Sequence, residues 1–179
     1  MTPLATLRDI DIFPNKEVSF VDEWVHRKTV KVIIMNADEK IALVTNPIHQ
    51  CFLLPGGGVD DGEEVFVAAD RESQEEAGCK FRSIRQIGTI VEFRSRDKKQ
   101  YETYGVIAEA GDPITNDLRT EEERKNQLSV VWVSREDAEN KFIAQEILVR
   151  EGKIDFYNSA FNIVRDHLYF REAIKQGLI

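Results

Sequence analysis

Four acidic residues fall within nine positions of the segment DRESQEEAG at residues 70–78: Asp70, Glu72, Glu75 and Glu76. Carboxylates three and four residues apart lie on one side of a helix, where like charges repel. A bound divalent cation relieves that repulsion, because Mg²⁺ takes oxygen ligands from carboxylates, waters and substrate phosphates. The spacing is therefore compatible with a metal site, but an acidic helix face seen alone is more often simply solvated, so the preceding segment has to decide between the two.

The flanking residues predict the helix that carries these carboxylates. Asp61 is a candidate N-cap, Glu64 three residues later completes a capping-box pattern, and Gly78 marks the end of the helix. Successive helical residues rotate by about 100°, which places the three glutamates on one side. The adjacent arc, expected to pack on a sheet, holds Val65, Phe66, Ala69, Ser73 and Ala77.

Three consecutive glycines precede this helix in the segment CFLLPGGG at residues 51–58. Without side chains, glycines let the backbone come close to a metal ion or a phosphate. The glycines and the acidic helix together suggest one site for a metal ion and a phosphorylated ligand.

This stretch resembles the Nudix box, G-x5-E-x7-R-E-U-x-E-E-x-G-U, in which U is a bulky aliphatic residue. The seven fixed positions are Gly57, Glu63, Arg71, Glu72, Glu75, Glu76 and Gly78. The two U positions depart from the pattern: they are Ser73, where a buried aliphatic side chain is expected, and Cys79. A motif with this many fixed positions is a specific signal. With its flanking strands, the chain is similar to the Nudix family over roughly residues 28–140.

The resemblance implies an α/β fold, the Nudix-type α/β/α sandwich with a mixed β-sheet. It also implies hydrolysis of a pyrophosphate (phosphoanhydride) bond in a nucleoside diphosphate linked to another moiety, with Mg²⁺ or Mn²⁺. The implied metal ligands are the backbone carbonyl of Gly56 and the side chains of Glu72, Glu75 and Glu76. Arg71 and Glu63 match residues that brace the loop and helix by ion pairing.

The general base has two candidate positions. Some relatives place it on the box helix, at the position of Glu72, and others on a later loop. Here the later segment RTEEER supplies Glu121, Glu122 and Glu123, for which a solvated charge run is the alternative.

Two functions remain open from the sequence. A MutT-like nucleoside triphosphate pyrophosphatase is the default enzyme, because no marker of another substrate class is found. The rival is a noncatalytic Nudix module that binds or senses a nucleotide or nucleotide sugar. Such modules commonly lose box carboxylates, and all of them are present here, which favours the enzyme.

Outside the box, the pattern predicts a mixed sheet with helices against it. Strands are expected at 29–35, 41–45, 87–93, 103–110 and 129–133, a short helix from residue 134, and a longer helix over about 155–174. Residues 1–24 are expected to form an N-terminal extension packed on the core, and 25–179 the Nudix domain with its C-terminal helix. The turn between the third and fourth strands carries basic residues that could contact phosphates or simply be solvated: Arg94, Arg96, Lys98 and Lys99.

Composition limits the partners and the compartment. The net charge of -8 argues against nonspecific nucleic-acid binding, which needs a positive surface. Cys51 and Cys79 are expected to be free thiols, and no signal peptide or membrane-length apolar run is recognised. The sequence therefore predicts a cytoplasmic protein with a small nucleotide-type substrate and no membrane partner. Relatives commonly dimerise, so a homodimer is left open.

Overall fold

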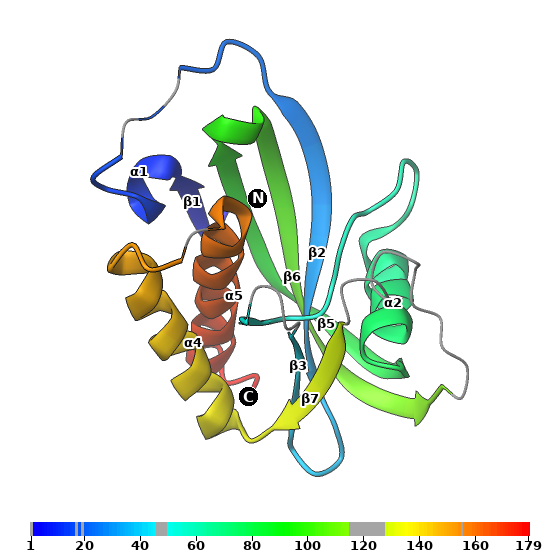
Figure 1. Ribbon diagram of the computed structural model, residues 1–179. Coiled ribbons are helices and arrows are strands. Elements are labelled where there is room, and N and C mark those ends of the chain that lie inside the picture. The colour runs from blue at the N-terminus through cyan, green and yellow to red at the C-terminus, as the bar shows by residue number, and fades with distance from the viewer. Residues whose placement is uncertain (1, 17, 19, 46–49, 115–127, 155) are drawn as a thin grey trace.

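The computed structural model describes residues 2–16, 18, 20–45, 50–114, 128–154 and 156–179. Within them, a mixed sheet of seven strands runs through the molecule (Figure 1). The strands are β1 (Ala5–Arg8), β2 (Val25–Met35), β3 (Ile41–Thr45), β4 (Phe52–Leu53), β5 (Cys79–Arg94), β6 (Lys99–Pro113) and β7 (Ser129–Val133). Their order is β1-β5-β6-β2-β3-β4, and β7 pairs with β3. The β1–β5 and β2–β6 pairs are parallel, and the remaining pairs are antiparallel.

Helices lie on both faces of this sheet. They are α1 (Asp9–Ile12), α2 (Val65–Glu76), α4 (Arg135–Arg150) and α5 (Tyr157–Lys175), with a 3-10 turn η1 (Ser95–Asp97) between β5 and β6. Figure 1 shows α2 on one side of the sheet and the α4–α5 pair on the other. This arrangement confirms the predicted α/β/α sandwich with a mixed sheet. Among the described residues, no helix is both long and apolar enough to cross a membrane.

The side-chain alternation of β2 separates the core into two parts. Val30, Val32 and Ile34 are fully buried against the α2 side, in the cluster that also holds Ala68 and Ala69 of that helix. Ile33 instead belongs to the larger cluster under α4 and α5. Because successive strand residues point to opposite faces, the strand contributes to both clusters. Small residues on α2 allow the helix to lie close to the sheet.

The N-terminal segment packs on the core through Leu7, Ile12 and Phe13, which belong to the cluster under α4 and α5. β1 extends the sheet by pairing with β5, and Asp9 of α1 accepts hydrogen bonds from the Ser95 amide at 3.0 Å and the Tyr157 hydroxyl at 2.7 Å. These bonds join the start of the chain to η1 and to α5. The boundary at residue 24 between an extension and the Nudix domain stays a prediction.

The sequence places Arg94 in a turn, where it could contact phosphates or be solvated, but the structure buries it. It ends β5 and is buried, with its Nη2 atom 2.8 Å from Glu92 Oε1 and its guanidinium 4.5 Å from the centre of the Tyr101 ring. Its role is therefore structural, inside the core under α5, and it cannot contact a phosphate from there. Arg96 and Lys98 of the same turn are exposed.

Both cysteines are buried free thiols. Burial raises the pKa of Cys79 to about 11 and raises the pKa of Cys51 as well. Since the thiolate is the reactive form, a raised pKa and low exposure both slow reaction with thiol reagents. We expect almost no labelling by a chromogenic disulfide reagent at pH 8 in the native protein, and labelling of two thiols after denaturation in urea. Rapid labelling of the native protein would contradict the buried positions.

Candidate active site

The acidic helix begins later than its sequence suggests. α2 starts at Val65 with Glu64 as N-cap and no side-chain cap, so the expected capping box at Asp61 is wrong. Residues 59–64 instead form a loop, in which Glu63 accepts a hydrogen bond from the Asp60 amide at 3.0 Å. The end of the helix agrees with the sequence, because Gly78 has a positive φ of 66° that an L-residue rarely adopts.

Arg71 holds the loop and the helix together. Its guanidinium pairs with Glu63 at 3.1 Å, with Glu72 at 2.7 Å and with Glu75 at 3.3 Å. Its Nη2 atom also donates to the Gly58 carbonyl at 2.8 Å. The hydrogen bond from Arg71 holds the pKa of Glu63 below its usual value. One side chain thus gathers three carboxylates of the box and one backbone carbonyl of the glycine segment.

The glycine segment, residues 54–58, runs alongside β2 and is joined to it by backbone hydrogen bonds. The amides of Val30 and Val32 donate to the carbonyls of Gly57 at 3.0 Å and Pro55 at 2.9 Å, and the Val59 amide donates to Lys28 at 3.0 Å. These backbone hydrogen bonds fix the segment independently of the acidic helix. They place its glycines directly under the glutamates of α2.

Glu72 lies against Gly57. A Cβ atom on Gly57 would fall 2.5 Å from Glu72 Oε1, so only glycine leaves room for this carboxylate. The Glu72 residue is only 7% exposed, and burial raises its pKa despite the opposing charges of Arg71 and Lys31. A carboxylate in this position is a stronger base than one in water.

Glu76 lies against Gly56. Its Oε2 atom accepts the Gly56 amide at 2.6 Å, and Gly56 itself has a φ of 129°. A Cβ atom there would lie 2.2 Å from the Val30 carbonyl oxygen, so the position requires glycine. The first and last glutamates of the motif R-E-x-x-E-E are thus each paired with one glycine.

Lys31 is a residue of this site that sequence reasoning missed. Its Nζ atom donates to the carbonyls of Leu54 at 3.0 Å and Gly56 at 2.5 Å. The signal was present in the sequence, because Lys31 is a lone charge in the apolar run TVKVIIM. Its contacts could not be inferred, since they depend on where the glycine segment crosses β2.

The donors at this site match the preferences of Mg²⁺ and Mn²⁺. Carboxylate oxygens of Glu72 and Glu76 lie beside the two glycines, and the Gly56 carbonyl is a further hard oxygen donor. Among the described residues, no three acidic, histidine or cysteine side chains converge closely enough to hold a metal ion. The protein's own groups hold these oxygens instead: Arg71 holds Glu72 and Glu75, and Lys31 holds Gly56. The residues fit a divalent metal ion in chemistry, and they would have to release these contacts to bind one.

Three further expectations from the sequence concern Ser73, Phe66 and the alternative base residues. Ser73, at the position where the motif expects an aliphatic side chain, is fully buried, and its hydroxyl has no hydrogen-bond partner among the described residues. Phe66, expected on the buried arc of the helix, is 46% exposed, and Ala68 takes its place in the core. The alternative base residues Glu121, Glu122 and Glu123 lie outside the described residues.

A family model described as the NUDIX domain matches residues 25–151. The chain belongs to the NUDIX family. A search of curated proteins finds no match.

Solved structures of NUDIX proteins share the fold. A NUDIX hydrolase from Nitrosomonas europaea superposes with a TM-score of 0.55 at 18% identity, covering 73% of this chain and 91% of that one. A mutator MutT protein from Bacillus halodurans superposes with a TM-score of 0.52 at 15% identity, covering 64% of this chain and 72% of that one. At these identities the likeness shows the fold alone.

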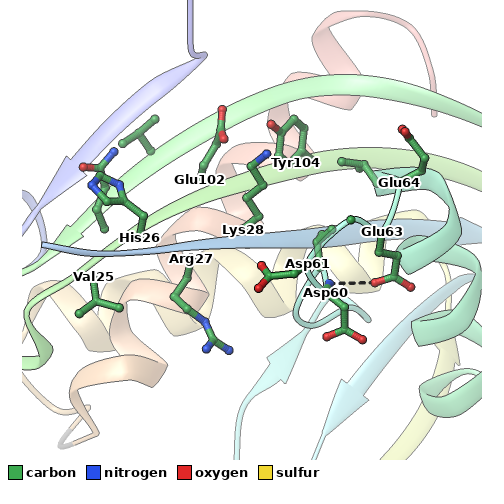
Figure 2. A pocket seen from close by; sticks show the side chains of 15 residues that line it. Val25, His26, Arg27, Lys28, Asp60, Asp61, Glu63, Glu64, Glu102 and Tyr104 are labelled. Atoms are coloured by element: carbon green, nitrogen blue, oxygen red, sulfur yellow. Dashed lines mark hydrogen bonds between the residues drawn. The ribbon is translucent and has the colours of Figure 1, made fainter.

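A cleft of about 1070 Å³ lies between the loop of residues 59–64 and the strands β2, β5 and β6. Figure 2 shows Lys28, Glu102 and Tyr104 rising from β2 and β6 on one side of it, with Glu63 and Glu64 nearby in the loop that leads into α2. The cleft lining includes Glu63 but none of the glutamates of the motif R-E-x-x-E-E. Arg71 therefore connects Glu63, in the wall of the cleft, with Glu72 and Glu75 on α2, because it forms an ion pair with each of them.

Proposed function

We propose that this NUDIX protein is a metal-dependent hydrolase of a phosphoanhydride bond in a nucleoside diphosphate linked to another moiety. A MutT-like nucleoside triphosphate pyrophosphatase is the first substrate class to test. The observation that carries the proposal is the pairing of Glu72 with Gly57 and of Glu76 with Gly56. Two carboxylates held over two glycines provide oxygen donors with no side chain between them and the backbone, so that a metal ion and a phosphate can come close.

The proposed ligands are the Gly56 carbonyl and the carboxylates of Glu72, Glu75 and Glu76. When bound, Mg²⁺ or Mn²⁺ supplies positive charge that offsets the negative charge of the phosphate oxygens. Glu72 is the proposed general base, because it is a buried carboxylate held against Gly57, beside the other proposed ligands. Arg71 and Glu63 are proposed as positioning residues, because their ion pair holds the loop of residues 59–64 against α2.

The glycine under Glu72 provides a matched test of this geometry. In Gly57→Ala the new Cβ would overlap the Glu72 carboxylate, whereas Gly58→Ala places its Cβ in open space among the described atoms. We expect Gly57→Ala to lower kcat/KM about tenfold to a hundredfold, since displacing a reacting group by about 1 Å has effects of this size. Gly58→Ala should stay within about twofold of the wild type. Equal activities of the two variants would show that the Glu72–Gly57 contact does not matter for turnover.

A noncatalytic sensor is the second candidate function. The observation in its favour is that Arg71 and Lys31 already hold carboxylate and carbonyl oxygens proposed as metal ligands. A sensor needs the nucleotide to bind without being cleaved, so binding and product formation must be measured on the same compounds.

The experiment is a substrate panel incubated with MgCl₂ or with a chelator. The compounds are normal and oxidised deoxynucleoside triphosphates, ADP-ribose, nucleotide sugars and dinucleoside polyphosphates, with products separated by ion-exchange chromatography. Metal-dependent release of a nucleoside monophosphate from one class supports the hydrolase and identifies its substrate. Thermal stabilisation by a nucleotide with no product from any compound would favour the sensor.

A further inference from the structure

Lys31 of β2 contacts two backbone carbonyls of the glycine segment. It comes from β2 on the same side as Ile33, and its ammonium group donates to Leu54 and Gly56 at 3.0 and 2.5 Å. An ammonium group on two carbonyl oxygens is a charge-assisted contact, which is stronger than one between neutral groups. The carbonyl of Gly56 is also the backbone ligand that the proposed function assigns to the metal ion.

The glycine segment has several other supports. The Leu54 amide donates to Asp166 of α5 at 2.9 Å, the Gly56 amide donates to Glu76 at 2.6 Å, and the carbonyls of Pro55 and Gly57 accept amides of β2. Because these bonds do not involve Lys31, the position of the Gly56 carbonyl does not depend on the lysine alone. A purely structural role for Lys31 would repeat what these bonds already do.

A lysine ammonium and a divalent cation compete for this oxygen. Two like charges a few ångströms apart repel strongly in a partly buried site, where the effective dielectric constant is well below that of water. The ammonium group must therefore leave the Gly56 carbonyl before a metal ion can use it. Lys31 has a flexible four-carbon stem, which allows such a movement.

We propose that Lys31 is a positioning residue that occupies the Gly56 carbonyl oxygen in the metal-free protein and is displaced when a divalent cation binds there. This inference rests on the proposed function, because it assumes that Gly56 is a metal ligand. In the metal-free protein the ammonium offsets the charge of the carboxylates, and it opposes metal binding until it is displaced.

The first test is calorimetric titration of the metal-free protein with MnCl₂ in the absence of nucleotide. We expect Lys31→Met to bind Mn²⁺ about tenfold more tightly than the wild type, because the contacts that the metal must break are missing. Lys31→Arg keeps a cation at this position and should retain the weaker affinity. Lys40→Met is the matched control, since it removes the same charge from an exposed position before β3 and should change the affinity by less than about twofold.

Equal or weaker Mn²⁺ binding by Lys31→Met would overturn the inference. Lys31 would then have only a structural role, which is to hold the glycine segment through its two hydrogen bonds. The absence of Mn²⁺ binding by the wild type would overturn the proposed metal site itself, so the two failures are distinguishable.

A second measurement uses the wild type alone and does not depend on the folding of a variant. The amine of Lys31 is acylated by a short pulse of an activated ester with and without saturating MnCl₂, and the modified peptides are quantified by mass spectrometry. We expect acylation of Lys31 to rise severalfold with Mn²⁺, while that of Lys40 stays constant. Unchanged or slower acylation of Lys31 in the presence of bound metal would also overturn the inference.

Discussion

Replacing Glu72 with glutamine is expected to lower kcat about 10²- to 10⁴-fold, the range for loss of a general base. The substitution keeps the size of a side chain that is 7% exposed and packed against Gly57, so the shape of the site is retained. It removes the negative charge that Arg71 contacts at 2.7 Å and the group proposed to accept the proton of the attacking water. The rate is measured at saturating MgCl₂ and substrate, which separates loss of the base from weaker metal binding.

Glu75→Gln is the comparison for this variant, because Arg71 contacts both carboxylates and Glu75 lies farther from it, at 3.3 Å. If Glu75 acts only as a ligand, raising the metal concentration should recover much of its activity, whereas Glu72→Gln should stay slow. If Glu72→Gln keeps most of its turnover, the base is elsewhere, and Glu121, Glu122 and Glu123 become the residues to substitute next.

Replacing Glu92 with glutamine is expected to lower the free energy of unfolding by about 3–5 kcal/mol, the usual cost of breaking a buried ion pair. Glu92 is fully buried under α5 and pairs with Arg94 at 2.8 Å and Arg165 at 3.3 Å. Burial alone would raise its pKa, but the charges of Arg165 and Arg94 more than offset this and hold the pKa below its usual value. Neutralising Glu92 leaves two buried guanidinium groups with less negative charge beside them.

The pH dependence of this effect has a definite sign. A carboxyl group whose pKa is lower in the folded protein stabilises the fold above its unfolded pKa, and this stabilisation is lost as the pH falls through the folded pKa. The difference between the wild type and Glu92→Gln, measured by urea unfolding, should therefore be largest near pH 7 and shrink in strong acid.

An exposed ion pair provides the control for the Glu92 variant. Lys175→Gln removes a partner of Glu172 at 3.1 Å, where the lysine side chain is largely exposed, and should change stability by less than about 0.5 kcal/mol. A loss below about 1 kcal/mol for Glu92→Gln would mean that the buried network rearranges or admits water when the charge is removed.

Most of the regular elements could be predicted from periodicity because each has a clear apolar face. β1, α1 and β4 were not predicted, because they have 4, 4 and 2 residues and are too short to show a periodicity. The strands of both hairpins and the C-terminal helix lie where the pattern places them, although β2, β5, β6 and α4 are longer than expected. The start of α2 was misplaced because Asp61 and Glu64 match a capping box in spacing alone. In the fold, Glu63 is bound by Arg71 and the Asp60 amide, and this holds residues 59–64 as a loop.

The site was only partly predictable for a different reason. The motif names residues within one short stretch, so the carboxylates could be listed from the sequence. The contacts of Lys31 and Arg94 join segments far apart in the chain, such as β2 with the glycine segment and β5 with α5. No local pattern reports such contacts, and a charged residue in a strand or turn looks solvated until its partners are known. The roles assigned to the box residues remain predictions.

The most direct test of the central claim is the rate of hydrolysis of the best substrate, titrated with MgCl₂, for the wild type and for Glu76→Gln. Glutamine can still accept the Gly56 amide hydrogen bond that Glu76 accepts at 2.6 Å, so the variant removes a charged ligand and keeps the local fold. We predict saturable dependence on Mg²⁺ in the wild type, and in the variant a rate lower by roughly a hundredfold at the Mg²⁺ concentration that half-saturates the wild type, with partial recovery at higher concentrations. Hydrolysis that continues in the presence of a chelator, or that Glu76→Gln performs at the wild-type rate, would contradict a metal-dependent reaction at this site.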